Sequence, residues 1–269
     1  MKKGTYAVLA ALIAGVLLLQ LLVRPSNDRQ WTVDNARIPR AEFNGPLVTV
    51  RNVRNFSYAS TTQFTPAWDD RTYDLRKLDS VWFLVEPFGE WDGPAHTFVS
   101  FGFGDEFVGI SVEIRKEQGE SFSPWRGLVR QYELAYVVGD ERDLVKLRSN
   151  YRKDDVYLYP VRTTPERMRK MFVDMLTRAN AVAEKPEFYN TLTNTCTTNI
   201  VRHANQVVPE RVPWSTAILL PGKSDRFAYE LGLIDTDVPP EELRKKYRIN
   251  DLAARYADDP QFSLRIRGR

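Results

Sequence analysis

The strongest constraint on the fold is a block of β-strand pattern between Val81 and Arg115. Val81–Val85 is a continuous apolar run of the kind found in central strands. Ala95–Phe103 and Phe107–Arg115 then flank a turn at Gly104 and Asp105, which predicts a β-hairpin. Residues equally distant from this turn should pair, so we expect the hairpin to be a fixed element around which the remaining strands assemble.

This hairpin carries His96, one of only two histidines in the chain. With the turn centred on Gly104 and Asp105, His96 lies opposite Glu113. A register shift of two residues places it opposite Ser111 or Arg115 instead, on the same face. Glu113 could then hold one imidazole tautomer as the third member of a catalytic triad, or it could be an ordinary surface carboxylate.

The rest of the pattern predicts an α+β fold, with an antiparallel sheet packed against helices. A helix should begin at Thr164 with Pro165 in its first turn, and its apolar residues recur at helical spacing. We interpret its methionine-rich stripe as core packing, not as a cofactor site. Further strands are expected at Leu47–Val53, Leu128–Val138 and Asp155–Pro160, an irregular loop at Asn55–Asp74, helices at Ser224–Gly232 and within Glu241–Asp259, and a short edge strand or frayed tail at Phe262–Arg267.

The single cysteine, Cys196, lies where a polar, β-branched segment runs into a predicted helix. The thiol should therefore sit in or beside the first helical turn, where unpaired backbone N–H groups and the helix dipole favour a thiolate. Asn194, Thr197 and Thr198 surround this helix start, and we expect the N–H groups there to bind an oxyanion.

A nucleophilic thiol needs a base, and the chain offers two histidines. His203 follows Cys196 by two helical turns, which at about 1.5 Å per residue is too far for proton transfer. By elimination, any Cys–His pair joins Cys196 to His96, provided that the fold brings the hairpin to the helix.

The N-terminal segment predicts a location in the cell envelope. Tyr6–Val23 is an apolar run interrupted only by Gln20, and it follows Lys2 and Lys3. At about 1.5 Å per residue it is close to the hydrocarbon thickness of a bilayer, and no small-x-small cleavage site follows it. We therefore expect a single-pass anchor in the bacterial inner membrane with the rest of the chain in the periplasm, a cleaved signal peptide being the alternative.

Domain organisation follows from these segments. Residues 1–23 form the predicted anchor, 24–45 a polar tether or docking arm, 46–235 the periplasmic domain and 236–269 a charged helical extension. The apolar segment Pro213–Gly222 is expected to cover the site.

Composition excludes several functions. A net charge of +3 with both signs interspersed does not indicate nucleic-acid binding. The sequence contains no glycine-rich phosphate loop, no metal-ligand spacing and no G-x-S-x-G motif, so no cofactor or metal is expected. Trp125 and Trp214 could line a groove for a lipid or glycan, although core packing is the default prediction for them.

Several motifs together resemble the Lnb N-terminal periplasmic domain family over roughly residues 50–235. They occur in the order Trp82–Phe88, Ala95–Phe103, Ile110–Glu117, Gln131–Leu134, Tyr157–Pro160 and Phe188–Asn199. The family is similar to circularly permuted papain-like folds of the NlpC type, in which the histidine strand precedes the cysteine helix.

The resemblance implies a function in the envelope. Family members associated with bacterial lipoprotein N-acylation use a cysteine and a histidine, and the matching positions here are Cys196 and His96. We therefore expect a thiol enzyme that acts on an ester or amide carbonyl of a lipid-linked or peptide substrate, by acyl transfer or by hydrolysis. A peptidase or amidase acting on cell-wall peptide and a non-catalytic interaction domain, in which Cys196 is an inert buried side chain, are the alternatives.

Overall fold

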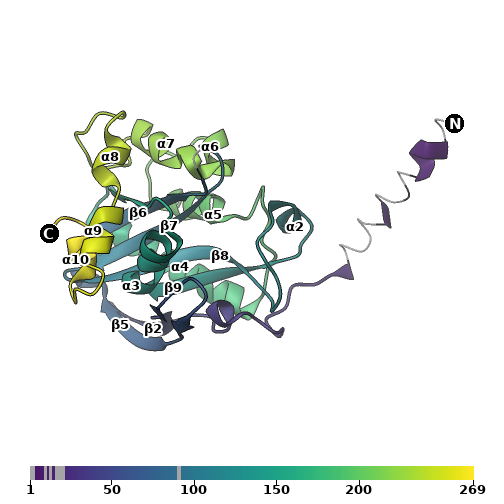
Figure 1. Cartoon of the computed structure of the whole chain (residues 1–269), viewed down its shortest axis with the longest axis horizontal. Helices are drawn as coiled ribbons and strands as arrows, with labels where there is room; N and C mark the ends of the chain where they lie inside the picture. The colour runs from purple at the N-terminus through teal and green to yellow at the C-terminus, as the bar shows by residue number, and fades with distance from the viewer. Residues whose placement is uncertain (1–3, 9–10, 12–13, 16–21, 90–91) are drawn as a thin grey trace.

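The computed structural model describes residues 4–8, 11, 14, 15, 22–89 and 92–269, and it contains one large β-sheet with helices on both faces (Figure 1). The strands are β1 (Arg40–Asn44), β2 (Leu47–Arg54), β3 (Ser57–Tyr58), β4 (Phe64–Thr65), β5 (Trp68–Asp74), β6 (Ser80–Pro87), β7 (Ala95–Phe103), β8 (Glu106–Arg115), β9 (Glu133–Asp140) and β10 (Tyr157–Pro160). The helices are α2 (Pro124–Leu128), α3 (Glu141–Lys146), α4 (Pro165–Glu184), α5 (Cys196–Ala204), α6 (Thr216–Leu219), α7 (Ser224–Glu230), α8 (Leu243–Tyr247), α9 (Asn250–Arg255) and α10 (Phe262–Arg265). Short helical segments of other types are η1 (Val33–Asn35), η2 (Leu75–Lys77), η3 (Leu147–Arg152) and η4 (Pro221–Lys223).

The large sheet has the strand order β1-β2-β9-β8-β7-β6-β10, with β5 paired to β2. Its neighbouring strands are antiparallel except β2 and β9, which meet in parallel at Arg54 and Gly139. The predicted α+β arrangement, with an antiparallel sheet against helices, is therefore observed.

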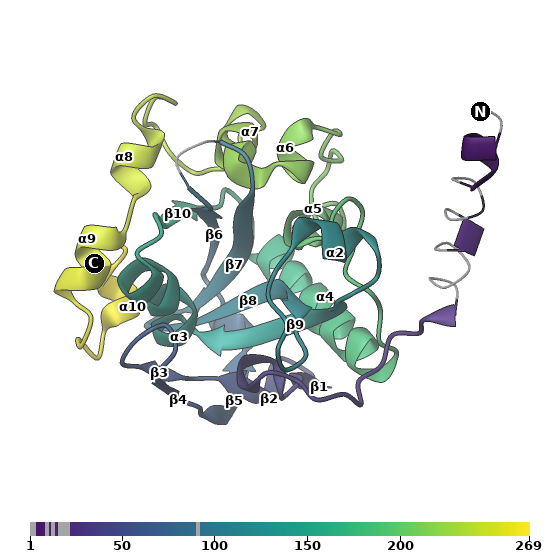
Figure 2. The same cartoon turned by 45° about the vertical axis from the view of Figure 1, so that its right-hand side comes forward.

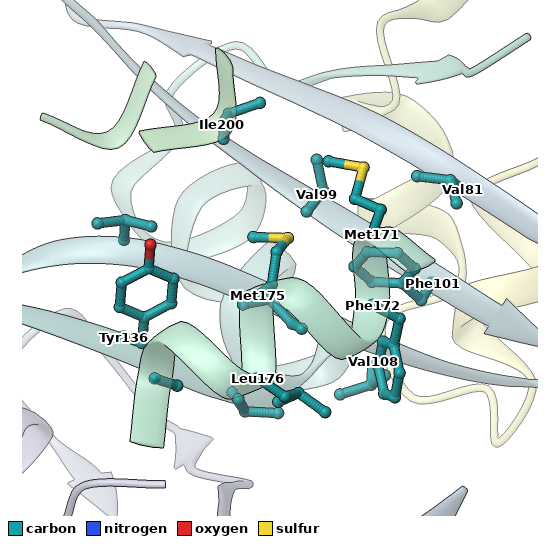
Figure 3. Packing of buried hydrophobic residues seen from close by; sticks show 14 of the residues in the cluster. Val81, Val99, Phe101, Val108, Tyr136, Met171, Phe172, Met175, Leu176 and Ile200 are labelled. Carbon is teal, nitrogen blue, oxygen red and sulfur yellow. The ribbon is translucent and has the colours of Figure 1, made fainter. Parts of the chain in front are cut away.

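The two faces of the sheet bury two separate hydrophobic clusters. Helices α4 and α5 cover one face, where the methionine stripe of α4 is buried as predicted. Figure 3 shows Met171, Phe172, Met175 and Leu176 packed against the sheet on this face. The other face is covered by α3, η3, α9 and α10, which bury a smaller cluster (Figure 2). Because side chains alternate along a strand, consecutive residues of β7 belong to different clusters.

The β7–β8 hairpin has the predicted register, with Phe98 opposite Ser111 and Phe103 opposite Glu106. The pairing stops at Phe98 and Ser111, although β7 begins at Ala95 and β8 continues to Arg115. Beyond this point β7 pairs only with β6, and β8 only with β9. The two strands thus separate at the level of His96.

The prediction of a membrane-spanning helix over Tyr6–Val23 is not supported by the structure. Within the described part of the chain, no helix is long and apolar enough to cross a membrane. Positions 9, 10, 12, 13 and 16–21 of the segment lie outside the described residues.

Residues 24–45 lie against the body of the protein. The backbone N–H of Ser26 donates to Glu133, Trp31 is buried beneath the guanidinium of Arg115, and β1 pairs along β2. Hydrogen bonds and packing therefore hold this polar segment onto the sheet.

Three local predictions were wrong. Residues 55–74 contain β3, β4 and β5 instead of an irregular loop, because this segment pairs with itself and with β2. The strand predicted from Leu128 begins only at Glu133, after helix α2. The tail at Phe262 is a helix, not an edge strand, because Phe262 and Ile266 pack one helical turn apart into the second cluster.

Candidate active site

Cys196 is the first residue of helix α5, as the sequence predicted. Thr195 is the N-cap: its hydroxyl accepts a hydrogen bond from the backbone N–H of Thr198, whose hydroxyl accepts from the N–H of Thr195. This reciprocal capping box fixes the helix start. The thiol is buried, with Sγ 3.7 Å from the hydroxyl oxygen of Thr197.

The residues predicted to surround an oxyanion site differ in whether their polar groups are already hydrogen-bonded. Asn194 donates to the carbonyl of Phe188 and accepts from Asn199, so its side chain is already engaged. Thr198 is used in the capping box, and the hydroxyl of Thr197 contacts that of Thr97 at 3.0 Å. The backbone N–H groups of the first helical turn have no intrahelical acceptor, so those of Cys196 and Thr197 are the groups able to hold an oxyanion.

His96 is joined to Glu113 through Ser111. The Nε2 atom of His96 lies 2.7 Å from Ser111 Oγ, and Ser111 donates to Glu113 Oε1 at 2.9 Å. Since the serine hydroxyl proton is used toward Glu113, Ser111 must accept from an Nε2–H, which fixes the imidazole tautomer. The Nδ1 atom is then the proton acceptor of the ring, and it has no hydrogen-bond partner among the described residues.

The orienting carboxylate is held in a buried network of charges. Arg148 donates to Glu113 at 2.9 Å and to Glu86 at 2.7 Å, and its side chain is 3% exposed. Burial alone would raise the pKa of Glu113, but the charges of Arg148 and His96 outweigh it and hold this pKa well below its usual range. Burial raises the pKa of Glu86 to about 7, against the opposing charge of Arg148.

Burial has the opposite effect on the imidazole. It lowers the pKa of His96 to about 3, with Glu113 opposing and Arg148 reinforcing the shift. His96 is therefore neutral at neutral pH.

The thiol and the imidazole approach the sheet from opposite faces. Thr97, next to His96, contacts Thr197, next to Cys196, so β7 and α5 meet at this level. Alternation along β7 directs His96 to the other face, where its ring stacks on Phe98. No hydrogen bond joins Sγ to the imidazole among the residues described.

Tyr189 belongs to the same buried cluster as Cys196. Burial raises the pKa of its phenol, and the charges of Cys196 and of Glu113 raise it further. Beyond Phe98 and Ser111 no ladder joins β7 to β8, although β7 still pairs with β6 and β8 with β9.

His203, which distance along the helix had excluded as the base, has its own partners. Its Nδ1 lies 2.6 Å from Asp174 and its Nε2 lies 2.7 Å from the hydroxyl of Tyr136. Both ring nitrogens are used, and the ring is buried in the interface between α4, α5 and the sheet.

The roles of three residues near this site were not predicted from the sequence. Ser111 was considered only as a register alternative, although its position in the polar alternation with Glu113 could have indicated a relay. Tyr189 and Arg148 gave no comparable indication, because they come from segments remote in sequence. Arg115, the other register alternative, donates instead to the carbonyl oxygen of Asn35.

Exposed apolar side chains surround the segment before Cys196. Helix α2 lies against this segment, since Thr191 donates to the carbonyl of Pro124. Trp125 on α2 is 78% exposed, and Trp214 is 74% exposed, so the default prediction that both belong to the core was wrong. Phe88, Phe122 and Leu192 are also exposed, and the rings of Phe88 and Phe122 are in contact.

Within the described part of the chain, no group of three His, Cys, Asp or Glu side chains is arranged to hold a metal ion.

Comparison with models of protein families confirms the family resemblance of the sequence motifs. The model of the Lnb N-terminal periplasmic domain matches residues 64–222, from β4 to η4, and covers more than half of the chain. The chain belongs to the Lnb N-terminal periplasmic domain family. This membership makes it a periplasmic protein of the cell envelope. Searches of curated proteins and of solved structures found no match, so the permuted papain-like arrangement stays a prediction.

Proposed function

We propose that this member of the Lnb N-terminal periplasmic domain family is a thiol enzyme that attacks an ester or amide carbonyl of a lipid-linked envelope substrate. The observation that carries the proposal is the separation of β7 from β8 at His96. There β7 also meets helix α5, through the contact between the hydroxyls of Thr97 and Thr197 beside the capped thiol. Hydrogen bonds from His96 to Ser111 and from Ser111 to Glu113 orient a neutral imidazole whose Nδ1 has no hydrogen-bond partner among the described residues. Packing of the core alone would not require this arrangement.

The chemistry would proceed in two steps. Because the two groups approach the sheet from opposite faces, the step requires substrate binding to bring them together; His96 Nδ1 then takes the thiol proton while Sγ bonds to the carbonyl carbon, and the N–H groups of Cys196 and Thr197 stabilise the oxyanion. The C–O or C–N bond to the leaving group then breaks, and the imidazolium returns the proton to that group. An amine or water attacks the resulting thioester, loses a proton to Nδ1 and releases the free thiol.

The exposed apolar side chains near the site favour a lipid-linked substrate over cell-wall peptide. Trp125, Phe122 and Phe88 are exposed, and side chains of this kind would contact acyl chains or a bilayer surface. We propose acyl transfer to an amine on a lipoprotein as the principal reaction, with hydrolysis as the same chemistry with water as acceptor.

Alkylation of Cys196 tests the thiol and its base, since the chain contains no other cysteine. Iodoacetamide should modify Cys196 of the folded protein faster than free cysteine at neutral pH, and His96→Ala should slow the reaction. His203→Gln, which changes the other histidine, is the matched control and should react like the wild type. Labelling that occurs only after denaturation would contradict a thiol enzyme.

The reaction itself is tested in cells that carry Cys196→Ala. Mass spectrometry would compare the acylation of their lipoproteins and the composition of their muropeptides with those of wild-type cells. We expect altered lipoprotein acylation and unchanged muropeptides. The reverse result would indicate a cell-wall peptidase or amidase.

A further inference from the structure

Exposed apolar side chains from three segments of the chain form one surface around helix α2, which we call the α2 surface. It consists of Phe88, Phe122, Trp125, Val129 and Leu192. The ring of Phe88, directly after β6, contacts that of Phe122, and the segment before Cys196 is joined to α2 by the hydrogen bond from Thr191 to Pro124. Segments remote in sequence therefore bring these side chains to one face of the molecule.

A glycine in α2 lets this surface lie directly on the segment that leads to the thiol. A Cβ atom at Gly127 would be 2.4 Å from Oγ1 of Thr191 and 3.3 Å from the ring of Tyr189, so a larger residue does not fit there without displacement. Tyr189 belongs to the same buried cluster as Cys196. Packing therefore joins the α2 surface to the cluster that contains the thiol.

The charges within the α2 surface are positive. Residues 121–132 include Arg126 and Arg130, both exposed, and contain no acidic residue; residues 188–200 contain none either. Glu120, which precedes the first of these segments, is half-buried and already accepts a hydrogen bond from a glutamine. Exposed aromatic rings beside arginines match the boundary of an anionic bilayer, where rings lie at the level of the headgroups and cations contact phosphates.

The N-terminal part of the chain meets the body at the same edge. Arg29 pairs with Glu117, which precedes the α2 segment, and with Glu133, which follows it. Figure 1 shows this part of the chain leaving the body on the side of α2. The apolar run of the sequence at residues 6–23 is therefore joined to the body beside the α2 surface, so a bilayer that contacts one can contact the other.

We infer that the α2 surface docks onto the surface of an anionic phospholipid bilayer, with Trp125 among the lipid chains and Arg126 at the phosphates. The inference rests on the proposed function, since it states how the thiol is brought to a lipid-linked substrate. A bilayer fits better than a protein partner, because apolar rings bordered by cations reproduce the layered order of hydrocarbon and phosphate. Docking in this way turns the segment before Cys196 toward the lipid.

The test uses the full chain with a single fluorescent label. Cys196→Ala removes the native thiol, and Val129→Cys then carries a nitrobenzoxadiazole group on the α2 surface. In vesicles of phosphatidylethanolamine and phosphatidylglycerol, lipids with a nitroxide on the acyl chain should quench this label, and Arg126→Glu should abolish most of the quenching. Arg255→Glu makes the same change of charge at an exposed position of α9, at the other end of the molecule, and should leave the quenching unchanged (Figure 1).

Three results would overturn the inference. The first is a label at position 129 that is quenched no more than one placed at the exposed Ala254 of α9. The second is equal quenching in the two glutamate variants, or in vesicles whose phosphatidylglycerol is replaced by phosphatidylcholine, because anionic lipid would then not be recognised. The third is a label shielded from iodide without lipid, and more strongly at higher protein concentration, which would mean that a second copy of the chain covers the surface.

Iodoacetamide reactivity of Cys196 in the otherwise unchanged chain separates this inference from the proposed function. A fast-reacting thiol without quenching at position 129 removes the docking alone. Quenching at position 129 with an unreactive thiol removes the enzyme alone.

Discussion

Replacement of Ser111 by alanine tests the relay that orients His96. The side chain of Ser111 is fully buried and makes two hydrogen bonds, one to Nε2 of His96 and one to Glu113. A typical hydrogen bond contributes about 0.5–1.5 kcal/mol, so losing both should lower the free energy of unfolding by about 1–3 kcal/mol. Urea denaturation measures this change.

The same substitution should affect the reactivity of the thiol. Without Ser111 the Nε2–H loses its acceptor, and Glu113 Oε1, 3.6 Å away, is too distant to replace it without moving. If the bond worth about 0.5–1.5 kcal/mol orients the ring in the transition state, the alkylation rate of Cys196 should fall roughly two- to tenfold. Stopped-flow measurement with iodoacetamide gives this rate.

The control separates reactivity from stability. Ser149→Ala removes another buried serine on the same side of the sheet, where the hydroxyl donates to the carbonyl of Val145. It should destabilise the protein but leave the alkylation rate unchanged. If Ser111→Ala lowers stability and leaves the rate equal to that of the wild type, the relay does not serve Cys196 and the proposed role of His96 is refuted.

Three further predictions follow from the buried charges and the helix start. Arg148→Met should lower the free energy of unfolding by about 3–5 kcal/mol in urea denaturation, because Glu86 and Glu113 would lose their buried partner. Thr195→Ala should cost about 1 kcal/mol in thermal or urea unfolding and should slow Cys196 alkylation, because it removes the N-cap of α5. The lowered pKa of His96 means that the unfolded chain binds a proton below about pH 6.5 and the folded chain only near pH 3, so its contribution to stability is lost as the pH falls through this window. Between pH 7 and pH 5 the wild type should therefore lose more stability than His96→Asn.

Each of these has a control or a contrary outcome. Arg76→Met breaks an ion pair whose arginine is 71% exposed, and it should leave the free energy of unfolding almost unchanged. Thr177→Ala, on the exposed side of α4, should leave alkylation unchanged. An equal loss of stability on acidification in wild type and His96→Asn would mean that the imidazole is not held neutral by burial.

Local sequence patterns predicted the elements whose form depends on near neighbours. The β7–β8 register followed from the turn at Gly104 and Asp105, and the buried stripe of α4 followed from helical spacing. The position of Cys196 at a helix start followed from the capping residues around it. These features depend on interactions over a few residues, which sequence patterns record.

Contacts between distant segments could not be predicted in this way. The end of pairing at Phe98, the contact of Thr97 with Thr197 and the insertion of Arg148 between two carboxylates are not encoded in any local pattern. Similarly, the apolarity of Trp125 predicts burial, and only the packed structure shows that the core has no place for it.

Local sequence patterns are enough to predict an α+β chain with a strand hairpin that carries His96 and a capped helix that begins at Cys196, because period, turn chemistry and capping act over short distances. The face of the sheet that each side chain occupies, the groups that neutralise the buried charges and the apolar side chains that stay exposed follow from the packed structure alone. Those outcomes depend on how elements remote in sequence pack together, and packing is a property of the whole chain.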